Sequence, residues 1–269
     1  MNFLWSLLFF AAFCAERIWT RVAANPFVDQ QLTLKSRIIG GTDAREGEIP
    51  WQVSLHHSRW GFFCGGTIVG RKHIVTAAHC SRNDRINVFV LAGSIDRKTG
   101  TRYDLQSITV HPDYDISSQK VQANDIAVWE VESPFIWSEN IQPVEIANSR
   151  VQDGWLMTVS GWGKTENTWN AFPSNYLKKA EVRIVNTEEC IQRYYAVFRA
   201  YIPDNTICAG GKEKDTCNGD SGGPLVKDGV LHGIVSFGVN TACGFLPGGY
   251  TEVALFANWI KNVIIENSE

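Results

Sequence analysis

Short β-prone segments recur along most of this chain, and they constrain its fold more than any other feature. They are rich in Val, Ile, Leu and Phe and are separated by clusters of Gly, Pro, Asn and Asp. The segments are 52–56, 67–69, 86–91, 107–110, 126–131, 156–160, 180–185, 224–226 and 230–237. Because no helical pattern alternates with them, a βαβ fold is excluded and an all-β barrel or sandwich is predicted.

One helical pattern closes the chain. Its apolar residues are spaced three or four apart, as on one face of a helix: Val253, Phe256, Ile260 and Val263, with Leu255, Trp259 and Ile264 widening the stripe. We expect an amphipathic helix packed on the β-structure. A helix lying on a membrane surface is not expected, since Lys261 is its only basic residue.

The amino terminus has the pattern of a secretory signal peptide. Residues 4–13 are almost entirely apolar, but the run is too short to span a bilayer, which needs about 20 residues. Small residues follow at Ala12, Cys14 and Ala15, where a signal peptidase cuts. We predict a signal peptide over 1–15 and a secreted, extracellular protein; the alternative is a buried amino-terminal helix.

The sequence contains seven cysteines, and removal of the signal peptide takes Cys14 away. An even number in a secreted chain indicates disulfide bonds, here up to three with 15 possible pairings. A metal site is not indicated because no two cysteines form a CxxC pair. The six remaining cysteines are Cys64, Cys80, Cys190, Cys208, Cys217 and Cys243.

Composition excludes two further classes of protein. The chain is 44% hydrophobic, which is too apolar for a disordered protein. Its net charge of −3 gives no indication of nucleic-acid binding. The polar segment 16–37 ends at Arg37, and the composition changes at Ile38. This change predicts a linker followed by a folded unit over 38–269.

Three separate segments carry residues suited to nucleophilic catalysis. Ser221 lies in the glycine-rich stretch 219–223, where a backbone turns tightly, and a serine needs a base to become a nucleophile. His79 follows an apolar run and is the natural base near neutral pH. Asp125 stands at the start of an apolar segment and orients a histidine when the two are in contact. Taken singly, they are equally consistent with a turn serine, a structural histidine and a turn aspartate.

The order His79, Asp125, Ser221 and the surrounding motifs resemble those of the trypsin-like serine proteases of the chymotrypsin family. The matching motifs run from Ile38 to about Ile260: IIGG, PWQVSL, CGGTIV, TAAHC, NDIAV, SGWGKT, ICAGG, DTCNGDSGGPLV and IVSFG. The resemblance implies two antiparallel six-stranded β-barrels, over about 38–143 and 144–252, and a carboxy-terminal α-helix. The active site is then expected in the cleft between the barrels.

The resemblance also implies the catalytic roles. Ser221 corresponds to the nucleophile, His79 to the general base and then acid, and Asp125 to the residue that orients His79. The backbone N–H groups of Gly219 and Ser221 correspond to the oxyanion hole. Peptide-bond hydrolysis through an acyl-enzyme is therefore expected, with activity that falls in acid as His79 is protonated.

Activation by proteolysis is expected on the same grounds. In this family, a cut before the IIGG-like segment frees an α-ammonium group that pairs with the aspartate preceding the serine. These residues are Arg37, Ile38 and Asp220 here, so 16–37 is an activation propeptide. The activating enzyme is expected to be a trypsin-like protease or the protein itself.

The resemblance assigns a substrate pocket as well. Asp215, six residues before Ser221, corresponds to the acid that selects Arg or Lys before the cleaved bond. Gly238 and Gly248 correspond to the glycines that keep the pocket open, and Ser236 to the serine beneath the catalytic aspartate. The rim departs from the family, because 239–242 is longer than usual before Cys243 and Phe237 replaces a tryptophan.

Disulfide pairing, cofactors and partners follow from the family too. The implied bonds are Cys64–Cys80, Cys190–Cys208 and Cys217–Cys243. No cofactor or metal is expected, since the loop 94–101, where relatives bind calcium, offers little beyond Asp96. We expect a monomer whose partners are protein or peptide substrates and protein protease inhibitors. Binding to nucleic acid or to a membrane is not expected. Two alternatives stay open: a catalytically silent homologue that binds or regulates, and an active protease of non-tryptic specificity.

Overall fold

The computed structural model describes residues 40–81, 85–115, 121, 123–166, 168, 170–212, 214–239 and 242–267. All of them belong to one compact unit, Ser36–Glu269. The predicted signal peptide 1–15 and propeptide 16–37, and with them Arg37 and Ile38, lie outside the described residues.

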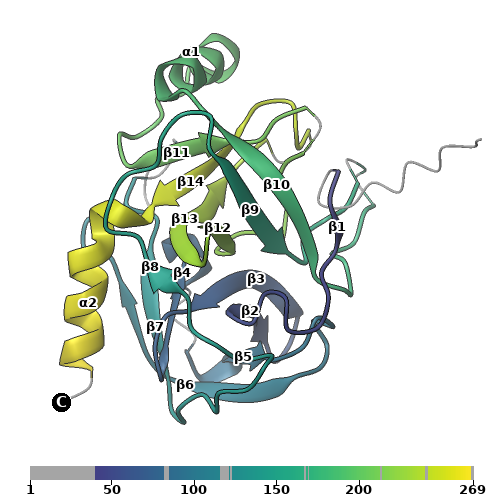
Figure 1. The fold of residues 1–269 in the computed structure, drawn as a ribbon, viewed down its shortest axis with the longest axis vertical. Coiled ribbons are helices and arrows are strands. Elements are labelled where there is room, and N and C mark those ends of the chain that lie inside the picture. Colours follow the sequence, from purple (N-terminus) through teal and green to yellow (C-terminus); the bar gives the residue numbers. More distant parts are fainter. Residues whose placement is uncertain are drawn as a thin grey trace, which may run out of the picture. The chain divides into compact units, whose positions relative to one another are not determined.

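Six antiparallel strands form a first closed barrel, in the order β2-β3-β4-β7-β6-β5. These strands are β2 (Gln52–His57), β3 (Gly61–Ile68), β4 (His73–Thr76), β5 (Val88–Ala92), β6 (Thr101–Val110) and β7 (Ala127–Val131). In Figure 1 this barrel occupies the lower half of the ribbon. Its interior is filled by apolar side chains such as Val53, Leu55, Ile74 and Trp129, none of which is exposed to solvent.

A second antiparallel barrel follows in the chain and lies above the first in Figure 1. Its strands run in the order β10-β11-β14-β13-β12-β9, and pairing of β9 with β10 closes the ring. They are β9 (Leu156–Gly161), β10 (Lys178–Val185), β11 (Thr206–Ala209), β12 (Pro224–Lys227), β13 (Val230–Phe237) and β14 (Gly248–Glu252). The two six-stranded barrels confirm the all-β fold expected from the sequence.

Two short strands add to the second barrel from outside. β1 (Thr42–Asp43) pairs with β10, with Thr42 opposite Lys179 and Asp43 opposite Lys178. The segment that opens the predicted first barrel, 38–143, therefore begins in the sheet of the second. β8 (Glu145–Ile146) pairs with β13 in parallel.

The closing helix, α2 (Ala257–Glu266), follows a 3₁₀ turn over Val253–Phe256. Although it comes after the second barrel, it runs beside β7 in Figure 1. Phe256, Ile260 and Val263 are buried in the same apolar cluster as the first barrel's core. The predicted stripe is correct for these residues but wrong for Leu255, which is 49% exposed.

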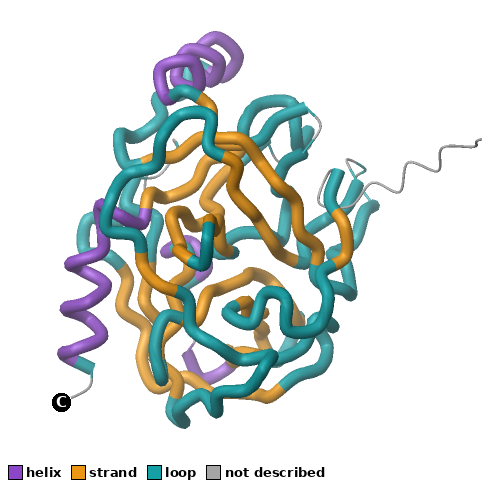
Figure 2. Tube along the Cα trace, viewed as in Figure 1, coloured by secondary structure: helices purple, strands orange, loops and turns teal. Residues whose placement is uncertain are grey.

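Several elements are not among those that the sequence pattern predicts. α1 (Thr187–Phe198), the upper helix in Figure 2, begins after Asn186, whose side chain accepts a hydrogen bond from the Glu189 N–H. Strands β1, β4, β8, β11 and β14 were also not predicted, and neither were residues 61–66 of β3 and 101–106 of β6. β14 begins with two glycines, which ordinarily indicate a turn.

Three disulfide bonds tie loops to this framework: Cys64–Cys80, Cys190–Cys208 and Cys217–Cys243. They are the same pairs that the family resemblance implies. Cys64–Cys80 connects β3 to the 3₁₀ turn Ala78–Cys80, while Cys190–Cys208 fastens α1 to β11. Bonds of this kind typically stabilise a fold by about 2–4 kcal/mol each.

Candidate active site

His79 and Asp125 are joined by two hydrogen bonds. The His79 backbone N–H donates to Asp125 Oδ1 (2.9 Å), and His79 Nδ1 lies 2.7 Å from Asp125 Oδ2. Because Oδ2 is an acceptor, Nδ1 carries a proton, which leaves Nε2 of the neutral ring free to accept one. His79 lies in the 3₁₀ turn directly after β4, and the Asp125 side chain is buried.

Three neighbours hold Asp125 in place. Ser236 Oγ donates to its Oδ2 (2.5 Å), and Thr251 Oγ1 donates to its backbone oxygen (2.8 Å). Asn124, just before it, adopts a left-handed conformation (φ 57°) and accepts a hydrogen bond from Asn205 Nδ2. The contact of Ser236 agrees with the position that the sequence assigned to it. Thr251 was missed, since a threonine in a strand gives no signal of such a role.

Ser221 lies where the second barrel meets the first. The Gly65 N–H of β3 donates to the Ser221 carbonyl oxygen (2.8 Å). A Cβ atom on the neighbouring Gly222 (φ 76°) would lie only 2.1 Å from Thr76 Oγ1 and 3.3 Å from Ala77 N. Ser221 therefore sits beside the end of β4, from which the chain continues to His79.

Gly219 has a backbone conformation that favours glycine (φ 101°). A Cβ atom there would lie 3.1 Å from Gly163 Cα and 3.5 Å from Phe62 Cε1. The residue thus passes close to the backbone of the loop after β9 and to a ring on β3. Its N–H and that of Ser221 are the two groups expected to bind an oxyanion.

Asp220, the residue before Ser221, is fully buried. Its Oδ1 accepts from the Gly163 N–H (2.8 Å) and its Oδ2 from the Cys217 N–H (2.9 Å). Burial raises the pKa of this carboxyl to about 6, although both N–H donors act in the opposite direction. Among the described residues no cation pairs with it. Gly161 is a glycine for steric reasons, because a Cβ atom there would meet Asp220 Oδ1 at 2.2 Å.

A cavity of about 50 Å³ opens next to Ser221. It is lined by Thr216, Cys217, Asn218, Ser221, Val235, Ser236, Phe237, Gly238, Val239 and Cys243. A Cβ atom on Gly238 would meet nothing within 4 Å, so a side chain there would extend into open space. The volume is that of one or two water molecules.

Asp215 is not among the residues that line this cavity, although its chain neighbour Thr216 is, and only 1% of Asp215 is exposed. Its carboxylate accepts hydrogen bonds from the N–H groups of Thr216 (2.8 Å) and Gly244 (2.7 Å). Burial raises the pKa of Asp215 to about 7. A Cβ atom on Gly248 would lie 2.8 Å from Asp215 Oδ1, so this position needs a glycine.

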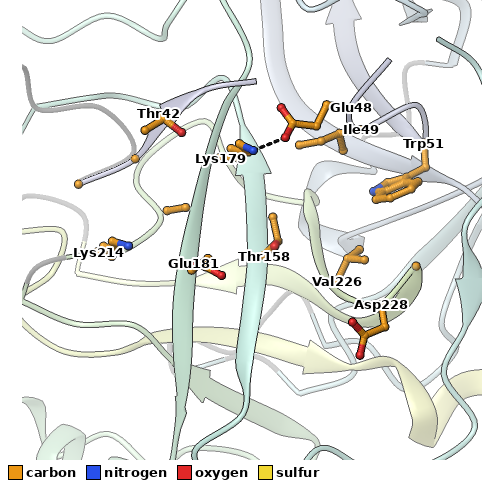
Figure 3. A pocket seen from close by; sticks show the side chains of 14 residues that line it. Thr42, Glu48, Ile49, Trp51, Thr158, Lys179, Glu181, Lys214, Val226 and Asp228 are labelled. Carbon is orange, nitrogen blue, oxygen red and sulfur yellow. Dashed lines mark hydrogen bonds and ion pairs between the residues drawn. The ribbon is translucent and has the colours of Figure 1, made fainter. Parts of the chain in front are cut away.

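A larger cavity, of about 450 Å³, lies elsewhere, between β1 and the strands β9, β10 and β12. Figure 3 shows the ion pair between Lys179 and Glu48 at its edge, with Lys214 and Glu181 further along. Its lining contains neither His79 nor Ser221. It therefore offers room but lacks the predicted nucleophile and its predicted base.

Residues of types that can bind a metal also come together at His79. Ligand atoms of Cys64, His79 and Cys80 lie within 4.8 Å of one another. Both sulfur atoms belong to the Cys64–Cys80 disulfide and cannot act as thiolate ligands. In the loop 94–101, where the sequence predicts no calcium site, Asp96 Oδ1 accepts a hydrogen bond from the Lys98 N–H.

Across the described residues, no helix has the length and apolarity needed to cross a membrane.

Comparison with known proteins gives a consistent result. The family model described as Trypsin matches residues 38–260. Trypsin 5G1 of Aedes aegypti is 35% identical over 237 residues, 86% of each chain. Trypsin delta of Drosophila erecta is 37% identical over 84% of this chain and 88% of its own.

One solved structure is similar to this chain over almost the whole length of the solved protein. It is that of neuropsin, described as a serine protease expressed in the limbic system of mouse brain. The similarity has a TM-score of 0.75 at 31% identity and covers 83% of this chain and 98% of the neuropsin chain.

Proposed function

This chain belongs to the trypsin family of serine endopeptidases, and we propose that it is a secreted zymogen that cleaves after Arg or Lys once activated at Arg37. The observation that carries the proposal is the chain of contacts from His79 through Asp125 to Ser236, which lines the same cavity as Ser221. Protein substrates follow from the family.

The chemistry proceeds in two halves. His79 Nε2 takes the proton of Ser221 Oγ as that oxygen attacks the carbonyl carbon, and then gives it to the leaving amine. Water, activated by the same nitrogen, hydrolyses the acyl-enzyme and restores Ser221. Asp125 holds the Nδ1–H tautomer at 2.7 Å and stabilises the imidazolium that forms in each half.

Gly219 and Ser221 stabilise the negative charge on the substrate oxygen through their N–H groups. Removal of one such donor typically reduces kcat by about 10²–10³. The φ of 101° at Gly219 supports this role, because it is a backbone conformation that other residues rarely adopt.

Specificity for Arg and Lys rests on Asp215. A buried carboxylate next to the cavity favours a cation, and its remaining lone pairs accept charge-assisted hydrogen bonds. The cavity beside Ser221 is the opening through which an Arg or Lys side chain would approach Asp215.

Activation would supply a partner for Asp220. Its carboxylate accepts two N–H hydrogen bonds but has no paired cation within the described part of the chain. Cleavage after Arg37 frees the Ile38 ammonium group, and pairing a buried carboxylate removes much of its desolvation penalty. The propeptide 16–37 contains no disulfide-bonded cysteine to hold it afterwards. Three disulfides within the protease unit support export to an oxidising compartment.

The test is a cleavage profile. The purified precursor is treated with immobilised trypsin, the trypsin is removed, and a new amino terminus at Ile38 is verified by sequencing. Peptides with Arg, Lys, Phe or Leu before the bond are then compared, with Ser221→Ala treated identically as the control.

We expect turnover after Arg and Lys only, by the wild-type protein only. No turnover by a chain that begins at Ile38 would contradict the catalytic proposal and favour a silent homologue. Turnover confined to Phe or Leu would contradict the role of Asp215. A precursor as active as the cleaved chain would contradict activation.

A further inference from the structure

Arg97 carries an incompletely paired guanidinium close to the catalytic loop. Its Nε donates to the Ser174 carbonyl oxygen (2.8 Å) and its Nη2 to Asn175 Oδ1 (3.2 Å). Within the described ranges, no carboxylate lies within 4.0 Å of it and Nη1 has no acceptor. Arginine stays charged in proteins, so this position holds a permanent positive charge with unused donors.

One aromatic ring separates this charge from the oxyanion hole. The Arg97 guanidinium carbon lies 5.5 Å from the centre of the Phe62 ring. Phe62 Cε1 lies 3.5 Å from the place where a Cβ atom on Gly219 would sit. The ring and the hydrogen bonds to Ser174 and Asn175 together fix the direction of the guanidinium.

The geometry also indicates which part of a substrate passes Arg97. The residue before the cleaved bond occupies the cavity beside Ser221, and Phe62 is not part of that lining. The leaving amine must face His79, which protonates it, and His79 belongs to the first barrel together with Phe62. Residues after the bond therefore run along the first-barrel side. An extended chain advances about 3.3 Å per residue, so the first three are within reach of Arg97.

Among the described residues, no neighbouring group forms an ion pair with Arg97. Burial, followed by repulsion from Arg97, lowers the pKa of His56 to about 4, so this histidine is neutral at physiological pH. Asp96 is the neighbouring carboxylate and attracts the Arg97 charge, but it does not come within 4.0 Å of the guanidinium, and its Oδ1 accepts the Lys98 N–H. Lys164, whose N–H donates to the Asn218 carbonyl oxygen, adds a second cation with no carboxylate of the described residues within 4.0 Å.

We propose that Arg97 is a specificity-determining residue that favours substrates with Asp or Glu among the first three residues after the cleaved bond. The inference rests on the proposed function, because it assumes cleavage at Ser221. The Asp or Glu side chain of the substrate accepts hydrogen bonds from Arg97 Nη1, while the Phe62 ring packs against the guanidinium. Basic residues at the same positions are disfavoured by charge repulsion.

The experiment uses internally quenched peptides with Arg before the bond. One peptide has three alanines after the bond, and three others carry a single Asp at the first, second or third of these positions. We expect at least one Asp peptide to be cleaved with a kcat/KM about three- to ten-fold above the alanine peptide. The preference disappears in Arg97→Gln, is partly kept in Arg97→Lys, and weakens as salt screens the charge.

Arg102→Gln is the matched control. Arg102 also lies over a phenylalanine, with its guanidinium carbon 4.1 Å from the Phe89 ring centre, but it pairs with Asp104. Its removal should leave the preference for Asp intact. A small arginine ester, which has no residue after the bond, reports catalysis alone and should be hydrolysed equally by all four proteins.

The outcomes separate this inference from the proposed function. Hydrolysis of the ester without any difference between Asp and Ala peptides overturns the inference alone. An Asp preference that survives in Arg97→Gln also overturns it, as does loss of ester hydrolysis in that variant, which would make Arg97 structural. Absence of all turnover by the activated wild-type protein overturns the proposed function, and the inference with it.

Discussion

The burial of Asp215 determines the pH range in which its carboxyl group is charged. Its side chain is almost completely buried and is held by two backbone N–H groups, from Thr216 and Gly244. Burial raises its pKa to about 7, so it is charged above that pH and increasingly neutral below it. Because a neutral carboxyl binds a cation weakly, selection of Arg and Lys should depend on pH near neutrality.

The binding of benzamidine, an aromatic amidinium, measures this dependence without the chemical step. In activated Ser221→Ala, we expect its Kd to be constant above about pH 7 and to rise about tenfold per pH unit below it. Calorimetric titration between pH 5 and 8.5 gives the profile. Asp215→Asn should bind weakly and show no pH dependence. A Kd in Ser221→Ala that is level from pH 5 to 7 would contradict the account.

The sequence proposes His79, Asp125 and Ser221 as catalytic candidates because each stands in a motif with a particular order and spacing. It was not sufficient for Thr251, whose contact with the Asp125 backbone depends on strands far apart in the chain. Arg97 was missed for the same reason, since its partners Ser174 and Asn175 come from another loop. Residues that act through tertiary contacts leave no local pattern.

At the scale of elements, the segment 219–223 is held against the first barrel by glycine. Gly222 has a left-handed backbone, and a side chain there would overlap Thr76 Oγ1 at 2.1 Å and the Gly65 carbonyl oxygen at 2.5 Å. Both of these atoms belong to the first barrel, so the absence of a Cβ atom allows the serine loop to approach β3 and β4.

Gly222→Ala should therefore lower the free energy of unfolding by about 2–4 kcal/mol, since strain and overlap add. We expect it to abolish activity as well, by moving Ser221 away from His79. Gly229→Ala is the control, because Gly229 has a similar φ of 77° but no atom within 4 Å of its added Cβ. Gly229→Ala should lower the free energy of unfolding only through backbone strain, and the variant should keep its activity. Equal unfolding curves in urea for the two variants would contradict the packing argument.

The sequence pattern predicted the longer apolar strands well, and it missed several short strands and some that glycine interrupts. β9 and β13 match their predicted ranges within a residue. β14 was missed because Gly248 and Gly249 suggest a turn. Gly249 is a glycine for a packing reason instead, since a Cβ atom there would lie only 2.1 Å from the Phe237 ring. α1 was missed because its Tyr, Val, Ile and Phe residues also favour strands.

At the scale of the whole molecule, the two barrels meet through buried polar contacts. Ser160 Oγ of β9 donates to Gln52 Oε1 of β2 (2.6 Å), and Gly65 of β3 binds Ser221. Asp220 lies close to this junction without an ion pair in the part of the chain that the structure describes. Under the proposed activation, Asp220 of the uncleaved protein is a buried carboxyl without an ion pair among the described residues, close to the junction of the two barrels.

This carboxyl should make the precursor less stable as pH rises. Since burial raises its pKa from 3.8 to about 6, the folded state retains a proton between about pH 4 and 6 that the unfolded chain has lost. The free energy of unfolding therefore falls across this window, by about 3 kcal/mol from Asp220 alone, and is level above it. In Asp220→Asn the fall should be smaller by that amount.

Urea titrations of the precursor at pH 4 and 7 measure the difference. Asp228→Asn is the control, because its side chain is 82% exposed and the substitution should not change the pH dependence. An identical fall in the wild-type protein and in Asp220→Asn would contradict the assignment of an unpaired Asp220 in the precursor.

The most direct test of the central claim is a burst titration with p-nitrophenyl guanidinobenzoate, an ester that places a guanidinium before the bond and forms a slowly hydrolysed acyl-enzyme. The account predicts a burst of about one nitrophenolate per molecule for protein that begins at Ile38, and none for the precursor or for Ser221→Ala. No burst from correctly cleaved wild-type protein would contradict a zymogen-derived, Arg-selective serine protease.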